Sequence, residues 1–258
     1  MNAKFEKVKC FLLDMDGTIY LDNEVIDGAI DAVNRMREKG KVIFLTNNSS
    51  RSKDAYVERL CSLGFKATES EVFTSGNATA EYLNTYYAGK KIFLFGTESL
   101  KSEFISAGIT VTDERPDLIV LAFDTTFNYD RLELMCNYVH EGVPYIATHP
   151  DDNCPTARGY KPDVGSFIAL IEKSTGVSPL LICGKPFRPI GESVERMLGL
   201  KSEEIAMVGD RLTTDIKFGI NNGFVSVFVL TGEGTIEQAH SLGLEPSVVL
   251  NSIAEWDK

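Results

Sequence analysis

The stretch Val8-Lys9-Cys10-Phe11-Leu12-Leu13-Asp14-Met15-Asp16-Gly17-Thr18 contains the pattern around which this chain is organised. Its mostly apolar run predicts a buried strand that ends at Asp14. In extended chain, residues two apart point to the same side, so Asp14 and Asp16 would face one spot. Gly17 allows the chain to turn away sharply. Two acids at a strand end, in a chain built of alternating strands and helices, predict a Mg²⁺ and phosphate site.

The composition is that of a globular protein with a net negative charge. Of 258 residues, 43% are hydrophobic and 24% charged, and the formal net charge is −11. Such a chain is poorly suited to binding a polyanion, so we expect no nucleic-acid partner. No apolar run approaches the ~20 residues that span a bilayer, so we expect no membrane partner. The first apolar run is short and ends in Asp14, so we expect no signal peptide.

The cysteines indicate a reducing compartment. All five are scattered and none forms a Cys-x-x-Cys pair, which favours free thiols and a cytoplasmic location. The three histidines are too few for a histidine-rich metal cluster.

Short apolar segments alternate with helical patterns of about ten residues, which predicts an α/β fold with parallel strands. The segments exceed what one compact sheet usually holds, so we expect two α/β layers from one chain. The pattern predicts strands at Lys41–Leu45, Leu180–Cys183 and Ile205–Val208, helices at Ala78–Tyr87 and Thr213–Ile220, and a long polar loop from His149 to Asp163.

Polar residues collect where the predicted strands end, which is where parallel sheets bind ligands. The set comprises Asp14 and Asp16, Thr46 and Asn47, Gly184 and Lys185, and Gly209 and Asp210, with Asp215 five residues later. The aspartates are hard oxygen ligands suited to Mg²⁺. Threonine, asparagine and backbone amides can donate to phosphate oxygens, and lysine supplies a positive charge. Taken singly, each motif is also typical of an ordinary turn or helix cap; their joint occurrence at strand ends favours a site.

Together these motifs resemble the four-motif signature of the haloacid dehalogenase (HAD) superfamily. They are Asp14-Met15-Asp16-Gly17-Thr18, Thr46, Lys185, and Gly209-Asp210 with Asp215. The tract Leu45-Thr46-Asn47-Asn48-Ser49-Ser50 is similar to the NagD-like branch with a C2-type cap, which includes nucleotide, sugar-phosphate, 4-nitrophenyl phosphate and pyridoxal phosphate phosphatases. The resemblance covers almost the whole chain.

The resemblance implies a Rossmann-like, doubly wound parallel core with an inserted, smaller α/β cap domain. The expected divisions are a first core part over residues 1–80, a cap over 81–179 and a second core part over 180–258. This insertion would explain why the strand pattern restarts after the first few elements.

The resemblance also implies roles for individual residues. Asp14 would be the nucleophile that forms an aspartyl-phosphate, and Asp16 the general acid and base. Mg²⁺ would be held by Asp14, Asp210 and Asp16, the last through its backbone carbonyl, with Asp215 orienting the site. The expected phosphate-binding residues are Asp16, Thr46, Asn47, Lys185, Arg211, Thr213 and Thr214, of which Thr46 and Lys185 are also expected to be catalytic.

The expected function is Mg²⁺-dependent hydrolysis of a small phosphorylated metabolite. A phosphotransferase or phosphomutase with the same intermediate, or a non-catalytic phosphometabolite-binding module, remain alternatives. The resemblance places the loop after Thr148 over the active site, so His149, Asp151 and Arg158 are candidates for leaving-group contacts; a solvated loop is the alternative. A homodimer would also be consistent with the resemblance.

Overall fold

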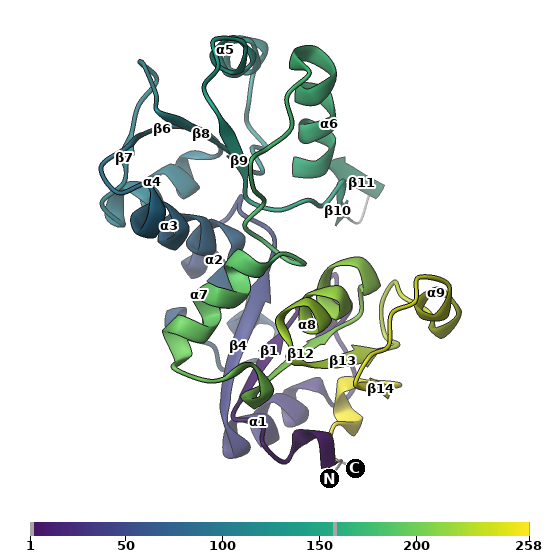
Figure 1. Cartoon of the computed structure of the whole chain (residues 1–258). Coiled ribbons are helices and arrows are strands. Elements are labelled where there is room, and N and C mark those ends of the chain that lie inside the picture. Colours follow the sequence, from purple (N-terminus) through teal and green to yellow (C-terminus); the bar gives the residue numbers. More distant parts are fainter. Residues whose placement is uncertain (1–2, 157–158, 258) are drawn as a thin grey trace. The chain divides into compact units, whose positions relative to one another are not determined.

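The computed structural model describes residues 3–156 and 159–257, and the chain divides into two compact units (Figure 1). The core unit comprises Met1–Thr46, Lys53–Phe73 and Lys185–Lys258, and the inserted unit comprises Asn47–Ser52 and Thr74–Gly184. The divisions expected at residues 80 and 180 stay predictions, and the first falls inside helix α3 (Ser75–Tyr86).

The core unit is built on a six-stranded sheet in the order β14-β13-β12-β1-β4-β5. Its strands are β1 (Cys10–Leu13), β4 (Lys41–Thr46), β5 (Val72–Thr74), β12 (Ile205–Gly209), β13 (Val225–Val229) and β14 (Val248–Leu250). The central strand β1 pairs in parallel with β4 and β12, and all of its residues are buried. A strand buried on both faces needs apolar side chains throughout, which explains its unbroken hydrophobic run. The predicted α/β class with a parallel central sheet is confirmed.

Five α-helices belong to the core unit: α1 (Ala29–Lys39), α2 (Lys53–Ser62), α7 (Arg188–Leu198), α8 (Lys217–Asn222) and α9 (Ile236–Ser241). Helix α1 buries Ala29, Ala32, Val33 and Met36, the spacing of one helical face. Two short strands, β2 (Tyr20–Leu21) and β3 (Glu24–Val25), form a hairpin after β1 that the sequence did not predict.

The inserted unit has its own four-stranded sheet in the order β7-β6-β8-β9. Its strands are β6 (Lys91–Phe95), β7 (Thr110–Val111), β8 (Leu118–Leu121) and β9 (Tyr145–Ala147), and its helices are α3, α4 (Glu98–Ser106), α5 (Tyr129–His140) and α6 (Val164–Thr175). Alternate residues of β6 enter two different apolar clusters. Ile92 and Leu94 pack with residues of α3 and α4, whereas Phe93 and Phe95 pack with residues of α5 and α6. Helices therefore cover both faces of this sheet.

Two sequence-based expectations for the inserted unit are wrong. The polar loop expected from His149 to Asp163 contains a hairpin of β10 (Asn153–Thr156) and β11 (Gly159–Pro162). The segment Leu180–Cys183 forms only an isolated bridge, Ile182 with Ala147, although its backbone hydrogen-bonds along β9. The segment lies beside β9 at the edge of the inserted sheet, so its backbone pairs there and not with the core sheet.

Helix boundaries also differ from the predictions. Helix α3 begins at Ser75 because the Thr74 side chain accepts a hydrogen bond from the Asn77 amide, which caps the helix earlier than expected. The helix expected over Thr213–Ile220 is a π-helical turn, Leu212–Ile216, followed by α8. None of the helices in residues 3–156 and 159–257 is both long and apolar enough to cross a membrane.

Candidate active site

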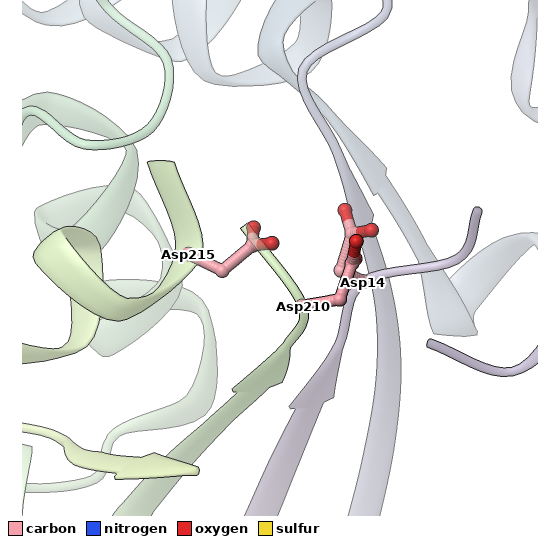
Figure 2. A group of neighbouring side chains, drawn as sticks. All are labelled: Asp14, Asp210 and Asp215. Atoms are coloured by element: carbon pink, nitrogen blue, oxygen red, sulfur yellow. The ribbon is translucent and has the colours of Figure 1, made fainter. Parts of the chain in front are cut away.

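Three carboxylates of the core unit converge at the carboxyl edge of its sheet (Figure 2). Asp14 directly follows β1 and Asp210 directly follows β12. These strands pair with Leu13 opposite Val208, so both aspartates emerge at the same edge. Asp215 reaches the same place from the π-helical turn. One oxygen of each carboxylate lies within 4.8 Å of the others.

Lys185 lies among these acids as a buried cation. Its Nζ is 2.6 Å from Asp14 Oδ1 and 2.6 Å from Asp215 Oδ1, and it donates to the Leu45 carbonyl at 3.4 Å. The side chain is only 2% exposed. Burial alone would lower the pKa of this ammonium, but Asp14 and Asp215 hold the pKa above its usual range. Lys185 is therefore a permanent positive charge against Asp14.

Asp210 is held from two sides by other parts of the core unit. The Thr18 hydroxyl donates to its Oδ1 at 3.2 Å, and the Glu233 amide donates to its Oδ2 at 2.9 Å. Gly17 and Gly232 lie so close to the carboxylate that an added Cβ would come within 2.5 Å and 1.9 Å of Asp210 Oδ2. The aspartate is thus confined to one orientation.

Burial and mutual repulsion raise the proton affinity of this cluster. Burial, with the charge of Asp14 as the next cause, raises the pKa of Asp210 to about 6. The same two causes raise the pKa of Asp215 to about 7, while Lys185 acts in the opposite direction. The raised pKa values of Asp210 and Asp215 show that excess negative charge remains beside Lys185, so the site favours a further cation.

The donor set fits Mg²⁺. It consists of closely spaced carboxylate oxygens at a buried strand edge, and hard divalent cations prefer such ligands. The clustered side chains are Asp14, Asp210 and Asp215, and the Asp16 side chain is not among them. The expectation that Asp16 binds Mg²⁺ through its backbone carbonyl stays a prediction.

Asp16 lies in the turn that follows β1, and it is exposed. The turn is closed by the Gly17 amide, which donates to the Tyr20 carbonyl at 2.7 Å, and the Thr231 hydroxyl donates to the Gly17 carbonyl at 2.7 Å. Desolvation by surrounding protein atoms raises the pKa of Asp16, and the charge of Asp14 adds to the shift. A raised pKa suits a group that must carry a proton.

The residues expected to bind phosphate occupy three kinds of place. Thr46 ends β4, beside β1, and is half-buried at the edge that carries Asp14. Thr214 is buried in the π-helical turn. Arg211 and Thr213 line a cavity of about 360 Å³ in the core unit, and their phosphate-binding role stays a prediction. In this cavity Arg211 forms an ion pair with Glu233 at 2.9 Å.

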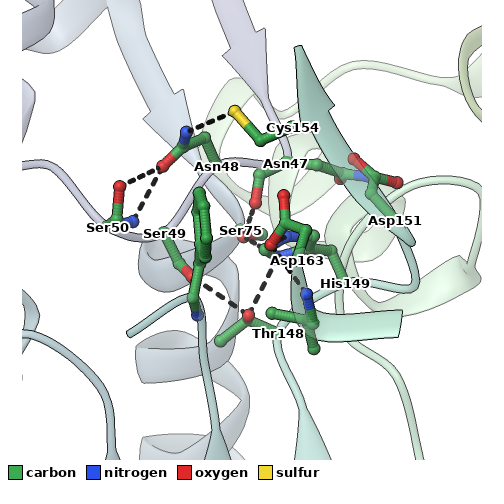
Figure 3. A network of polar contacts seen from close by, with 12 residues as sticks. Asn47, Asn48, Ser49, Ser50, Ser75, Thr148, His149, Asp151, Cys154 and Asp163 are labelled. Carbon is green, nitrogen blue, oxygen red and sulfur yellow. Dashed lines mark hydrogen bonds and ion pairs between the residues drawn. The ribbon is translucent and has the colours of Figure 1, made fainter. Parts of the chain in front are cut away.

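Asn47 belongs to the inserted unit, where its Nδ2 donates to Asp151 Oδ1 at 3.0 Å (Figure 3). His149, a candidate for leaving-group contact, is fully buried, with Nε2 2.9 Å from Asp163 Oδ1. A solvated position therefore does not describe His149, and its contact with a leaving group stays a prediction. Asp151 is half-buried, and Arg158 lies outside the described residues.

Sequence reasoning missed the groups that fix Asp210. Thr18 ends the Asp-x-Asp-Gly-Thr run, so a signal for it existed in the motif itself. Glu233 contributes its backbone amide, a group that every residue type except proline has. The residue type at position 233 therefore could not indicate this contact with Asp210.

Comparison with known proteins assigns the family. A haloacid dehalogenase-like hydrolase model matches residues 11–110, and a HAD-hydrolase-like model matches residues 182–256. The acid sugar phosphatase of Staphylococcus aureus (strain MRSA252) is 34% identical over 252 residues, which are 97% of this chain and 97% of that protein. This chain belongs to the haloacid dehalogenase-like hydrolase family.

Solved structures of HAD proteins agree over nearly the full length. The 4-nitrophenylphosphatase from Thermotoga maritima superposes with a TM-score of 0.94 at 42% identity, covering 98% of each chain. NagD from the E. coli K-12 strain has a TM-score of 0.89 at 32% identity, covering 97% of this chain and 98% of NagD. The predicted HAD family and NagD-like branch are confirmed, and the chain is a HAD-type phosphatase.

Proposed function

We propose that this phosphatase hydrolyses small phosphomonoesters, with Mg²⁺ as cofactor and an aspartyl-phosphate on Asp14 as intermediate. The observation that carries the proposal is the placement of Asp14 at the carboxyl end of β1, 2.6 Å from a buried lysine and clustered with two further carboxylates. A carboxylate held beside a fixed cation can accept an approaching phosphate dianion that it would otherwise repel.

The chemistry divides into two displacements. An oxygen of Asp14 attacks phosphorus, the bond from phosphorus to the ester oxygen breaks, and Asp16 protonates the departing alcohol. Water then attacks the aspartyl-phosphate, Asp16 takes its proton, and the phosphorus–Asp14 bond breaks to release phosphate. The raised pKa of Asp16 supports the first of these proton transfers.

The other core residues would bind the phosphoryl group, compensate its charge or hold the metal ion, according to their positions. Lys185 offsets charge on Asp14 and on the phosphoryl group, and Thr46 donates to phosphoryl oxygens from the end of β4. Asp14, Asp210 and the Asp16 carbonyl would hold Mg²⁺, with Asp215 orienting Lys185 through their 2.6 Å contact. When bound, the metal ion would neutralise charge that develops on the phosphoryl oxygens.

The relatives and the charge of the chain support the proposed substrate class. The relatives are named as acid sugar and 4-nitrophenyl phosphatases, which supports sugar phosphates or aryl phosphates as substrates; nucleotides are proposed from the sequence resemblance alone. The net charge of −11 disfavours nucleic acid. In this proposal the inserted unit acts as the cap, and the enzyme works in the cytoplasm; a homodimer remains a prediction.

Substitution of the nucleophile tests the proposal. Asp14→Asn should lower kcat for 4-nitrophenyl phosphate at least about a thousandfold, because an amide cannot form the acyl phosphate. Asp27→Asn, at an exposed position of the core unit, is the matched control and should retain wild-type activity. Circular dichroism checks that both variants fold.

Retention of more than a small fraction of activity in Asp14→Asn would exclude Asp14 as the nucleophile. Product analysis with an added sugar acceptor separates the alternatives. Free phosphate indicates hydrolysis, whereas a phosphorylated acceptor would indicate a phosphotransferase. Wild-type protein that binds a phosphate ester without turnover would indicate a binding module.

A further inference from the structure

The segment 47–50 is held inside the inserted unit by the ends of three of its strands (Figure 3). After β6, the Thr97 hydroxyl donates to the Ser50 carbonyl at 3.2 Å. After β8, the Phe123 amide donates to Ser49 Oγ at 3.0 Å. After β9, Thr148 Oγ1 lies 3.1 Å from Ser49 Oγ. One short segment is therefore hydrogen-bonded to residues that follow β6, β8 and β9.

This edge of the sheet is the place where a doubly wound fold usually binds a separate ligand. The order β7-β6-β8-β9 reverses direction between β6 and β8, and ligands bind outside the carboxyl ends of the strands at such a switch point. Here Ser49 and Ser50 occupy the carboxyl ends of both strands. The inserted unit thus binds a piece of its own chain where a ligand would otherwise lie.

A buried chain of polar groups extends from this segment. Ser49 contacts Thr148 Oγ1, Thr148 Oγ1 lies 2.9 Å from His149 Nδ1, and His149 Nε2 lies 2.9 Å from Asp163 Oδ1. All four side chains are buried, and Thr148 and His149 are 0% exposed. Burying so many polar groups is unfavourable unless they satisfy one another.

The direction of the hydrogen bonds is set by the two ends of this chain. The Phe123 amide can only donate, so Ser49 Oγ accepts there and is free to donate to Thr148. The Asp163 carboxylate accepts, so His149 Nε2 carries a hydrogen, and in the neutral imidazole Nδ1 then accepts from the Thr148 hydroxyl. Every hydroxyl then both donates and accepts, which orders the network as a single unit.

The same network fixes Asn47. The Ser75 hydroxyl donates to the Asn47 carbonyl and lies 3.4 Å from His149 Nδ1. The Asn47 side chain donates to Asp151 at 3.0 Å. A Cβ at Gly184 would lie 2.7 Å from Asn47 Oδ1, so no larger residue fits beside it. Both the backbone and the side chain of Asn47 are thereby held.

We propose that Ser49, Thr148 and His149 are positioning residues for phosphate binding. They hold segment 47–50 within the inserted unit, so the network fixes the position of Asn47 at the start of that segment. The inference rests on the proposed function and takes Asn47, the residue after Thr46, as a further phosphoryl ligand. Because the network acts through Asn47, it affects the phosphoryl group common to all substrates rather than the leaving group.

The affinity for inorganic phosphate tests this role, because phosphate has no leaving group. Thr148→Val, nearly isosteric without the hydroxyl, should raise the inhibition constant of phosphate roughly tenfold, as expected for an interrupted buried hydrogen-bond chain. It should lower kcat/KM by the same factor for 4-nitrophenyl phosphate and for a sugar phosphate. Thr148→Ser, which keeps the hydroxyl, should retain near wild-type values.

Two further variants separate positioning from a loss of stability. Val139→Ala removes apolar packing from α5 in the same unit; it should lower Tm but leave the phosphate inhibition constant unchanged. Ser49→Ala breaks the same chain one link earlier, so it should resemble Thr148→Val, and the double variant should lose no more than either single variant.

The inference is overturned if Thr148→Val and Ser49→Ala bind phosphate like wild type. It is also overturned if Val139→Ala, at the same loss of Tm as Thr148→Val, weakens phosphate binding by the same factor. Unequal losses for the two esters would also overturn it, since they would show contact with the leaving group. If the wild-type enzyme binds phosphate but hydrolyses neither ester, the proposed function fails instead, and phosphate binding still tests the network.

Discussion

At the scale of single residues, the site is a problem of charge. Lys185 is the buried cation that contacts both Asp14 and Asp215, while Asp210 is held by a hydroxyl and an amide. Neutral donors orient a carboxylate but do not cancel its charge. The excess of acid over base therefore makes protonation or a bound metal ion favourable, and these two must compete.

That competition predicts a pH-dependent effect of Mg²⁺ on stability. The pKa of Asp210 is raised to about 6 and that of Asp215 to about 7, against ~3.9 for an unfolded aspartate. The folded state thus binds protons that the unfolded state has released, and the free energy of unfolding of the metal-free protein falls as pH rises from about 4 to about 7. Above that range Mg²⁺ should restore the lost stability.

Thermal unfolding measures this effect. Saturating MgCl₂ should raise Tm by several degrees at about pH 8 and by much less at about pH 5, where protons occupy the site. EDTA should reverse the rise and abolish activity, and Asp210→Asn should lose most of the Mg²⁺-dependent rise. An equal Tm increase at both pH values would contradict a metal site made of these carboxylates.

At the scale of elements, the site depends on where strands end and how the chain leaves them. Strands β1 and β12 lie in register, so their following residues meet without further adjustment. Two glycine-containing turns, at Gly17 and Gly232, then pack directly against Asp210. The absence of a side chain at these turns is what leaves room for the carboxylate.

This packing predicts a large effect from one added methyl group. Gly232→Ala would place Cβ 1.9 Å from Asp210 Oδ2, so the aspartate must move. We expect kcat to fall about ten- to a hundredfold, the range seen when groups that orient metal ligands are lost. The Mg²⁺ concentration needed for half-maximal activity should rise as well.

Gly199→Ala is the matched control for this variant. Gly199 has a φ of 65° but no atom near its missing Cβ. Alanine there should cost ~1 kcal/mol of stability through backbone strain and leave the Mg²⁺ dependence unchanged. Wild-type Mg²⁺ dependence in Gly232→Ala would show that Asp210 is not a ligand.

Elements whose form depends on local capping or on available neighbours were the least predictable. The Thr74 cap moves the start of α3 to Ser75, ahead of the apolar run that indicated a helix. Leu180–Cys183 has the composition of a strand but lies along the edge of β9 with only a bridge. Composition measures the preference of a segment for extended structure, not which partner it will have.

At the scale of the molecule, each unit has its own hydrophobic core. One cluster joins Phe11, Val33, Phe44 and Trp256 in the core unit. Separate clusters around β6 and β8 serve the inserted unit. The carboxylate cluster lies wholly within the core unit. A metal ion bound there should therefore stabilise the core unit rather than the inserted unit.

Hydrogen exchange should reveal this separation. Mg²⁺ should slow exchange in peptides that cover β1 and β12, because binding stabilises the state in which the Asp14 and Asp210 strand ends are held together. Peptides that cover β6 and β8 should be unchanged. Slower exchange confined to β6 and β8 would contradict the placement of the metal in the core unit.

The sequence by itself determined the fold class, the family resemblance and the core motifs, because an apolar strand followed by Asp14 or Asp210 is a local pattern. Only the tertiary structure decided that Asp215 joins these two aspartates while the Asp16 side chain does not. It alone showed that segment 47–50 is anchored at the strand ends of the inserted unit. The physical reason is that such contacts join residues up to about two hundred positions apart, as Asp14 and Asp215 are. Backbone amides and buried hydroxyls acquire partners only when packing brings them together.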